Sequence, residues 1–165
     1  MTPMAILPSA LAGRFVGTML LTTVMRGAGE MGLTRMDLPL LLGTTVTDSR
    51  RTAKAVGYVF HFLLGIGFAF LYAFCFFAIG SSSWWLGALL GALQAVFNGT
   101  VLVNVLLPVV HPRIGTPDSA ASEISLLEPP GFLMLNYGRN TFLVTLLAHV
   151  AYGAIVGWAV RIPGA

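Results

Sequence analysis

Two histidines are the residues of this sequence whose type and position best suit chemistry. His61 and His149 each lie inside a continuously apolar stretch, and each begins a His-x-x-x-Gly pattern that ends at Gly65 or Gly153. Titratable side chains are costly inside a membrane unless they face the interior of a helix bundle or water. The two histidines lie about six and eight residues into their stretches, so their depths are ~9 Å and ~12 Å at ~1.5 Å per residue. We therefore expect two imidazoles at similar depth that point inward.

Two carboxylates are candidates to share a site with these imidazoles. Asp37 begins Asp-Leu-Pro-Leu-Leu-Leu and Glu128 begins Glu-Pro-Pro-Gly-Phe-Leu, so each acid precedes proline and an apolar strip. Imidazole nitrogens and carboxylate oxygens bind Zn, Fe and Mn, which predicts a metal site made of Asp37, His61, Glu128 and His149. The two histidines could instead be axial ligands of a haem, hold a chlorophyll magnesium, or carry protons together with the acids. Asp37 equally suits a simple role as the N-cap of a short helix.

Further polar residues are candidates to orient these groups. Asn98 continues a stripe of Gly87, Gly91 and Gln94 along one face of a helix. Asn104 lies deeper in the membrane than His111-Pro112, the pair at the end of the same stretch. His111 also suits a plain helix terminus, and Tyr152, one turn beyond His149, also suits core packing. The predicted supporting residues are Asn98, Asn104, His111 and Tyr152.

Membrane helices must position these side chains. The chain of 165 residues is 56% hydrophobic and 9% charged, with a mean hydropathy of +0.85, whereas a soluble domain has about 25% charged residues. Apolar stretches at 8–25, 55–79, 84–110 and 141–160 predict four transmembrane helices in one all-α domain, arranged as two hairpins. The stretches lack the alternation of a lipid-facing barrel. The lone Cys75 provides no disulfide framework and no cysteine metal motif.

Basic residues predict how these helices are oriented. The loop 26–54 contains Arg26, Arg35, Arg50, Arg51 and Lys54. The loop 111–140 adds Arg113 and Arg139, whereas Arg14 and Arg161 belong to the other side. The positive-inside rule then places both loops in the cytoplasm and both termini outside. The nine basic residues are scattered and the net charge is only +3, so no nucleic-acid partner is predicted.

The two halves of the sequence echo one another. Gly13-x-x-x-Gly17 and Gly87-x-x-x-Gly91 are each followed by an acid, proline, an apolar strip and His-x-x-x-Gly. This order predicts a parallel internal repeat about an axis along the membrane normal. The strips are too short to span a membrane and begin with proline, so we expect short interfacial or re-entrant half-helices in both loops. Small residues at four-residue spacing predict tight packing in the outer half and a wider polar vestibule inside.

Four runs resemble a family of small bacterial four-helix integral membrane proteins of uncharacterised function. They are TRMDLPLLLGT, FHFLLGIGFAFLYA, LEPPGFLMLNYG and LLAHVAYGAIVG. The resemblance covers nearly the whole chain. It implies a bacterial inner-membrane location and the four-helix fold, and it carries over no catalytic residues.

These patterns predict a membrane protein with a cytoplasm-facing polar pocket that binds a metal ion, a cofactor or a small polar ligand. One alternative is a non-catalytic subunit of a larger photosynthetic or respiratory complex, whose histidines are structural or hold a pigment or haem. Another is a small homodimeric transporter. The predicted partners are the bilayer and either further copies of the chain or the subunits of such a complex. The histidines match no motif of catalytic spacing such as His-Glu-x-x-His, so the residues assign no reaction.

Overall fold

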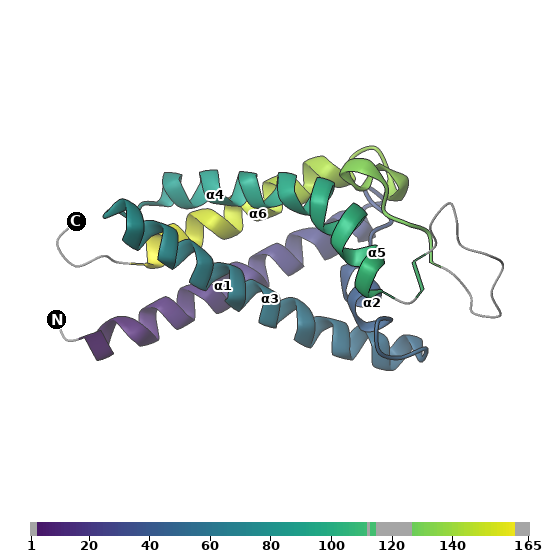
Figure 1. The fold of residues 1–165 in the computed structure, drawn as a ribbon, viewed down its shortest axis with the longest axis horizontal. Helices are drawn as coiled ribbons and strands as arrows, with labels where there is room; N and C mark the ends of the chain where they lie inside the picture. Colours follow the sequence, from purple (N-terminus) through teal and green to yellow (C-terminus); the bar gives the residue numbers. More distant parts are fainter. Residues whose placement is uncertain (1–2, 112, 115–126, 161–165) are drawn as a thin grey trace.

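The described part of the chain consists of helices joined by turns and loops. The computed structural model describes residues 3–111, 113–114 and 127–160, of which no segment forms a strand. Arg161 and residues 115–126 of the second predicted loop lie outside this range. The elements are α1 Pro3–Glu30, α2 Leu38–Gly43, α3 Arg50–Ile79, α4 Trp84–Phe97, η1 Asn98–Leu106, α5 Leu107–Val110, η2 Phe132–Tyr137 and α6 Thr141–Ala159 (Figure 1).

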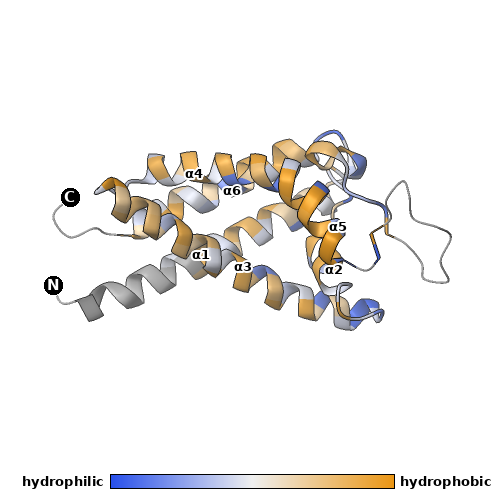
Figure 2. Cartoon of the chain, viewed as in Figure 1, coloured by the Kyte–Doolittle hydropathy of each residue, from blue (hydrophilic) through white to orange (hydrophobic). Residues whose placement is uncertain are grey.

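Three helical segments of the described chain are long and apolar enough to cross a membrane. They are α3, the continuous segment Trp84–Val110 that comprises α4, η1 and α5, and α6. Figure 2 shows apolar residues along each of them. The predictions for 55–79, 84–110 and 141–160 are thereby confirmed as membrane-type helices. The predicted span 8–25 lies within α1, whose 28 residues extend about 42 Å at ~1.5 Å per residue, and its crossing stays a prediction.

The helices place the loops at one end of the molecule. The beginning of α1, the end of α6 and the turn between α3 and α4 lie together at the left of Figure 1. At the opposite end are α2, α5 and η2. The hairpin prediction requires this grouping, because it puts α2 and η2, which come from the two longer loops, on one side of the bundle.

Small residues bring α6 close to its neighbours. Gly87 and Gly91 of α4 face the carbonyl oxygens of Gly153 and His149, and a Cβ atom at either glycine would clash with those backbones. On the other side of α6, Gly17 of α1 packs against the ring of Tyr152. The prediction that these glycines allow close packing is confirmed.

The helices α1 and α3 meet at one crossing point. A Cβ atom at Gly65 of α3 would clash with the side chain of Thr18 of α1. Near this point the rings of Phe15 and Phe62 lie 5.3 Å apart. From the crossing toward the loops the two helices diverge (Figure 1). The divergence opens a space between them at the loop end.

The first predicted half-helix is confirmed as α2. One carboxylate oxygen of Asp37 accepts a hydrogen bond of 3.1 Å from the backbone N–H of Leu40, so Asp37 is the N-cap. Pro39 follows within the first turn, where its missing N–H costs nothing. Gly43 and Gly57 allow the backbones of α2 and α3 to touch. The helix therefore lies directly on α3.

The second strip does not form a matching half-helix. It forms η2, a 3-10 segment in which Leu133 and Met134 have φ angles of 52° and 59°. Because these two residues have left-handed backbone angles, the second strip cannot form a regular right-handed helix as the first strip does in α2. The parallel internal repeat is accordingly not confirmed.

Pro108 accounts for the unusual helix that precedes it. Proline lacks a backbone N–H and its ring clashes with the carbonyl four residues earlier, and here the nine residues before Leu107 form the π-helix η1. The side-chain nitrogen of Asn104 donates hydrogen bonds of 2.9 Å and 3.0 Å to the carbonyls of Gly99 and Thr100. The Asn104 amide is therefore bound to the backbone of its own helix.

Candidate functional site

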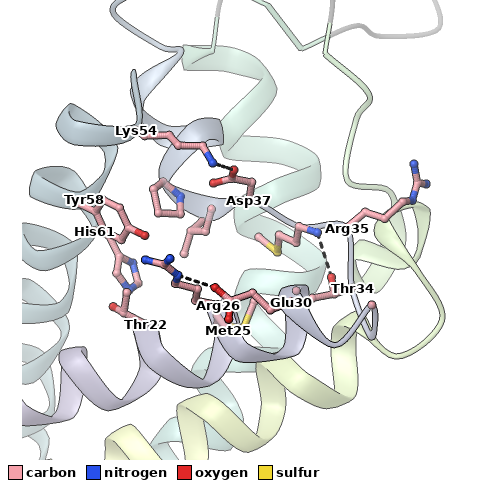
Figure 3. A pocket seen from close by; sticks show the side chains of 15 residues that line it. Thr22, Met25, Arg26, Glu30, Thr34, Arg35, Asp37, Lys54, Tyr58 and His61 are labelled. Carbon is pink, nitrogen blue, oxygen red and sulfur yellow. Dashed lines mark hydrogen bonds and ion pairs between the residues drawn. The ribbon is translucent and has the colours of Figure 1, made fainter. Parts of the chain in front are cut away.

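A groove of about 660 Å³ occupies the space between the diverging helices. Its walls are the last turns of α1, the loop before α2, the start of α2 and the first half of α3. Figure 3 shows its polar side chains, which come from all of these elements. The charged and titratable side chains that line it include Arg26, Glu30, Asp37, Lys54, Tyr58 and His61.

The charged residues of the groove form pairs. On α1, Arg26 Nε lies 2.9 Å from Glu30 Oε1. On the other wall, Lys54 Nζ of α3 lies 2.7 Å from Asp37 Oδ2. Asp37 therefore caps α2 and also lines the groove, whereas its role as a metal ligand stays a prediction. The hydrogen bond that Arg26 donates to the Glu30 carboxylate raises the pKa of Arg26 above its ordinary value, so the guanidinium is charged at any physiological pH.

His61 lies where this groove meets a second, smaller cavity. The inner cavity measures about 80 Å³, and His61 lines both spaces. The residue is only 8% exposed, and its buried Nε2 atom has no hydrogen-bond partner among the described residues. A buried polar atom without a partner is an exception in native proteins and calls for an explanation.

His149 faces the same inner cavity from α6. Its Nδ1 atom lies 2.8 Å from the backbone carbonyl of Thr145. A carbonyl only accepts, so Nδ1 carries the hydrogen, and Nε2 of the neutral ring accepts from Asn98 Nδ2 at 3.0 Å. These bonds fix the orientation of the Asn98 amide. Its Oδ1 atom, like His61 Nε2, is buried and has no hydrogen-bond partner among the described residues.

The inner cavity unites four of the predicted site residues: His61, Asn98, His149 and Tyr152. The hydroxyl of Tyr152 donates to the carbonyl of Gly65, so this tyrosine joins α6 to α3. The cavity is far smaller than a haem or a chlorophyll. A haem or pigment held by the two imidazoles stays a prediction.

Three other predicted residues lie elsewhere. Glu128 Oε2 is 3.3 Å from Arg35 Nη1 and does not line the groove. His111 is 2% exposed, and its Nε2 donates a 2.9 Å hydrogen bond to the carbonyl of Leu41, so it anchors the end of α2. Asn104 is exposed on η1. The predicted metal set is thus not brought together, and within the described residues no three His, Cys, Asp or Glu side chains could share a metal ion.

The segment beyond Glu128 forms a clamp at the loop end. The Tyr137 hydroxyl donates a 2.7 Å hydrogen bond to the backbone carbonyl of Glu128, and the backbone N–H of Arg35 donates one of 2.7 Å to the carbonyl of Tyr137. Burial, and then the charge of Glu128, raises the pKa of Tyr137 to about 12. Beneath the clamp, the buried hydroxyls of Thr34 and Thr141 are 2.8 Å apart. These bonds hold the loop that forms one wall of the groove.

Sequence reasoning missed the cations and the tyrosine of the groove. Arg26 and Lys54 were interpreted only as charges that set topology. Their spacing contained a usable signal, because Lys54, Tyr58 and His61 follow an i, i+4, i+7 pattern that places them on one helix face. Only the crossing of α1 and α3 turns that face toward Arg26.

Comparison of the chain with protein-family models, curated proteins and solved structures gives no match. The resemblance to small bacterial four-helix membrane proteins stays a prediction. The site itself combines charged pairs at the mouth, an imidazole at the floor and a small, mainly apolar cavity behind it.

Proposed function

We propose that this protein is a four-span membrane protein that binds a small polar or amphipathic ligand in its groove. The ligand enters from the side of the two longer loops, and its polar group bonds to His61. The single observation that carries this proposal is the buried Nε2 atom of His61, which has no partner among the described residues and lies at the floor of an open groove.

The energetic cost of that arrangement supports a binding role. A buried donor or acceptor that lacks a partner costs about 1–3 kcal/mol. The surroundings of His61 in the inner cavity are largely apolar, so an aliphatic side chain would suit the folded state better. Residues that lower stability without a structural benefit are typical of functional sites. A ligand group that bonds to Nε2 would recover the lost stability on binding.

The surrounding charges support the membrane placement. The groove lies at the end of the bundle where the loop 26–54 carries its arginines and Lys54. By the positive-inside rule this end faces the cytoplasm, and we propose the bacterial inner membrane as the location. We propose α1 as the fourth span, which is supported by the packing of its Gly13 and Gly17 against α6.

Mass spectrometry of the purified protein tests the proposal. The protein is extracted from its native membranes in mild detergent, and molecules that co-purify are identified for the wild type, His61→Leu and Asn104→Leu. Asn104 is a matched control, because it is an exposed polar residue of a membrane helix outside both cavities.

We expect one species near one molecule per protein in the wild type and in Asn104→Leu. In His61→Leu its content should fall about tenfold, equivalent to ~1.4 kcal/mol. Equal content in wild type and His61→Leu would contradict the proposal, as would the absence of any bound species from the wild type.

A further inference from the structure

The charges on the groove walls restrict what its ligand can be. Arg26 and Lys54 are positive and Glu30 and Asp37 are negative, so these four side chains carry no net charge. The side chains of the first pair are 69% and 67% exposed and those of the second are 43% and 34% exposed. Exposed ion pairs contribute only about 0–1 kcal/mol. Each pair can therefore exchange its partner for a ligand at little cost.

The remaining cation of the groove is already committed. Arg35 contacts Glu128 and the backbone carbonyl of Asn136. Figure 3 shows its side chain extending away from the other charged groups. It therefore does not disturb the balance between the four side chains.

A ligand with one sign of charge does not suit this lining. A simple anion would take Arg26 and Lys54 but would leave Glu30 and Asp37 facing it. A simple cation would meet the reverse problem. A ligand that carries both signs can satisfy all four side chains, because its anionic group pairs with the cations and its cationic group with the carboxylates.

The carboxylates favour a primary ammonium as the cationic group. An –NH₃⁺ group offers three hydrogen-bond donors to carboxylate oxygens, whereas a quaternary ammonium offers none. Quaternary ammonium groups are typically bound in cages of aromatic rings. Among the described residues that line the groove, Tyr58 is the one aromatic ring besides the imidazole of His61.

The apolar part of the groove indicates that the ligand is a lipid. Below the charged groups the lining consists of side chains such as Met25, Met36 and Leu38, and these three also line the inner cavity. Leu64 lines the inner cavity and is 45% exposed on the outer surface of α3, a membrane-type helix. The charged groups lie near the loop-side start of α3, where lipid headgroups meet water.

We infer that the groove binds a zwitterionic phospholipid whose headgroup ends in a primary ammonium. The phosphate lies between Arg26 and Lys54, and the ammonium lies between Glu30 and Asp37. The acyl chains leave through the space between α1 and α3, and His61 contacts the polar linkage between headgroup and chains. This inference rests on the proposed function and names its ligand class.

Competition between lipids with identical chains tests the inference. Delipidated protein in detergent is titrated with phosphatidylethanolamine, phosphatidylcholine or phosphatidylglycerol, and bound lipid is counted by native mass spectrometry. Soluble phosphoethanolamine is added in a separate arm. We expect phosphatidylethanolamine to bind about tenfold more tightly than either other lipid, or ~1.4 kcal/mol, and the soluble headgroup not to displace it at equal concentration.

Variants locate the selectivity in the groove. Lys54→Gln and Glu30→Gln should each abolish the preference, whereas Arg51→Gln should keep it. Arg51 is the matched control, because it is an exposed cation in the first turn of α3 that does not line the groove.

Several outcomes would overturn the inference. Equal binding of phosphatidylglycerol would mean that the carboxylates make no contact, and equal binding of phosphatidylcholine would exclude the ammonium hydrogen bonds. Displacement by phosphoethanolamine alone would identify a soluble ligand. If no lipid is preferred but a species that depends on His61 still co-purifies, the inference fails and the proposed function stands. If no binding depends on His61, both fail.

Discussion

Replacing His61 by leucine should stabilise the ligand-free protein, although it removes a polar residue that we propose to bind the ligand. No hydrogen bond to Nε2 is lost, because this buried atom has no partner among the described residues. Leucine resembles histidine in size, and Leu38 and Phe68 are among the apolar side chains that line the same cavity. The substitution therefore removes a desolvation cost without opening a large void.

The expected gain follows from the cost of a buried unpaired group. That cost is about 1–3 kcal/mol. For a chain of this size about 1 kcal/mol corresponds to roughly 2–4 °C in the midpoint of thermal unfolding. The free energy of unfolding of His61→Leu should thus rise by ~1–3 kcal/mol, and its Tm should rise by several degrees.

His149→Leu is the matched control, because the same chemical change occurs in the same cavity. His149 makes two hydrogen bonds, to the carbonyl of Thr145 and with Asn98 Nδ2. Its removal leaves the Asn98 amide unpaired, so we expect a loss of about 1–3 kcal/mol. The two variants should therefore shift Tm in opposite directions.

Thermal unfolding of delipidated protein in one detergent, followed by tryptophan fluorescence, measures both shifts. A fall in Tm for His61→Leu that matches the fall for His149→Leu would refute the reasoning. It would mean that Nε2 is satisfied in the ligand-free protein, and that His61 has no unmet bond to offer a ligand. Adding phosphatidylethanolamine should raise the Tm of the wild type more than that of His61→Leu.

Three further predictions concern the parts that support the groove. Gly91→Ala should lower the free energy of unfolding by about 1–3 kcal/mol or more, because its Cβ would clash with the carbonyl of His149. Gly67→Ala has open space around its Cβ and should raise the free energy of unfolding by about 0.5–1 kcal/mol in the same unfolding assay. Asp37→Ala should lower the free energy of unfolding by about 0.5–2 kcal/mol through the lost cap of α2, and Asp37→Asn should lower it less because its amide oxygen can still cap. Both variants should lose lipid selectivity in native mass spectrometry. Because the pKa of Tyr137 is raised in the folded protein, the contribution of its hydroxyl to stability is complete below the unfolded-state pKa of about 10 and is lost as the pH rises through about 12. The difference in Tm between wild type and Tyr137→Phe should therefore be constant to about pH 10 and then shrink.

Sequence patterns predicted the helices well because membrane insertion is governed by local composition. A stretch of about 20 apolar residues is recognisable wherever it occurs, and three of the four predicted stretches are confirmed. The cap of α2 was equally predictable, since Asp37 and Pro39 act within one turn. The small-residue faces of α4 and α6 followed from spacing alone.

The cavity residues were predicted in part. His61, Asn98, His149 and Tyr152 share the inner cavity, as expected for polar groups that avoid lipid. Glu128 was predicted to share a site with the histidines, but it forms an ion pair with Arg35. This pairing was not predictable, because the two residues are far apart in the sequence.

Polar side chains inside a membrane helix must turn inward, and this rule made the depth and direction of both histidines readable from residue order. Which groups they meet depends instead on where helices cross and how closely their backbones approach. Gly65 against Thr18 sets the crossing of α1 and α3, and Gly57 against Pro39 seats α2 on α3. Those contacts bring Lys54 to Asp37 and open the groove above His61. Such pairings join residues distant in the chain, so they arise from packing rather than from any local pattern.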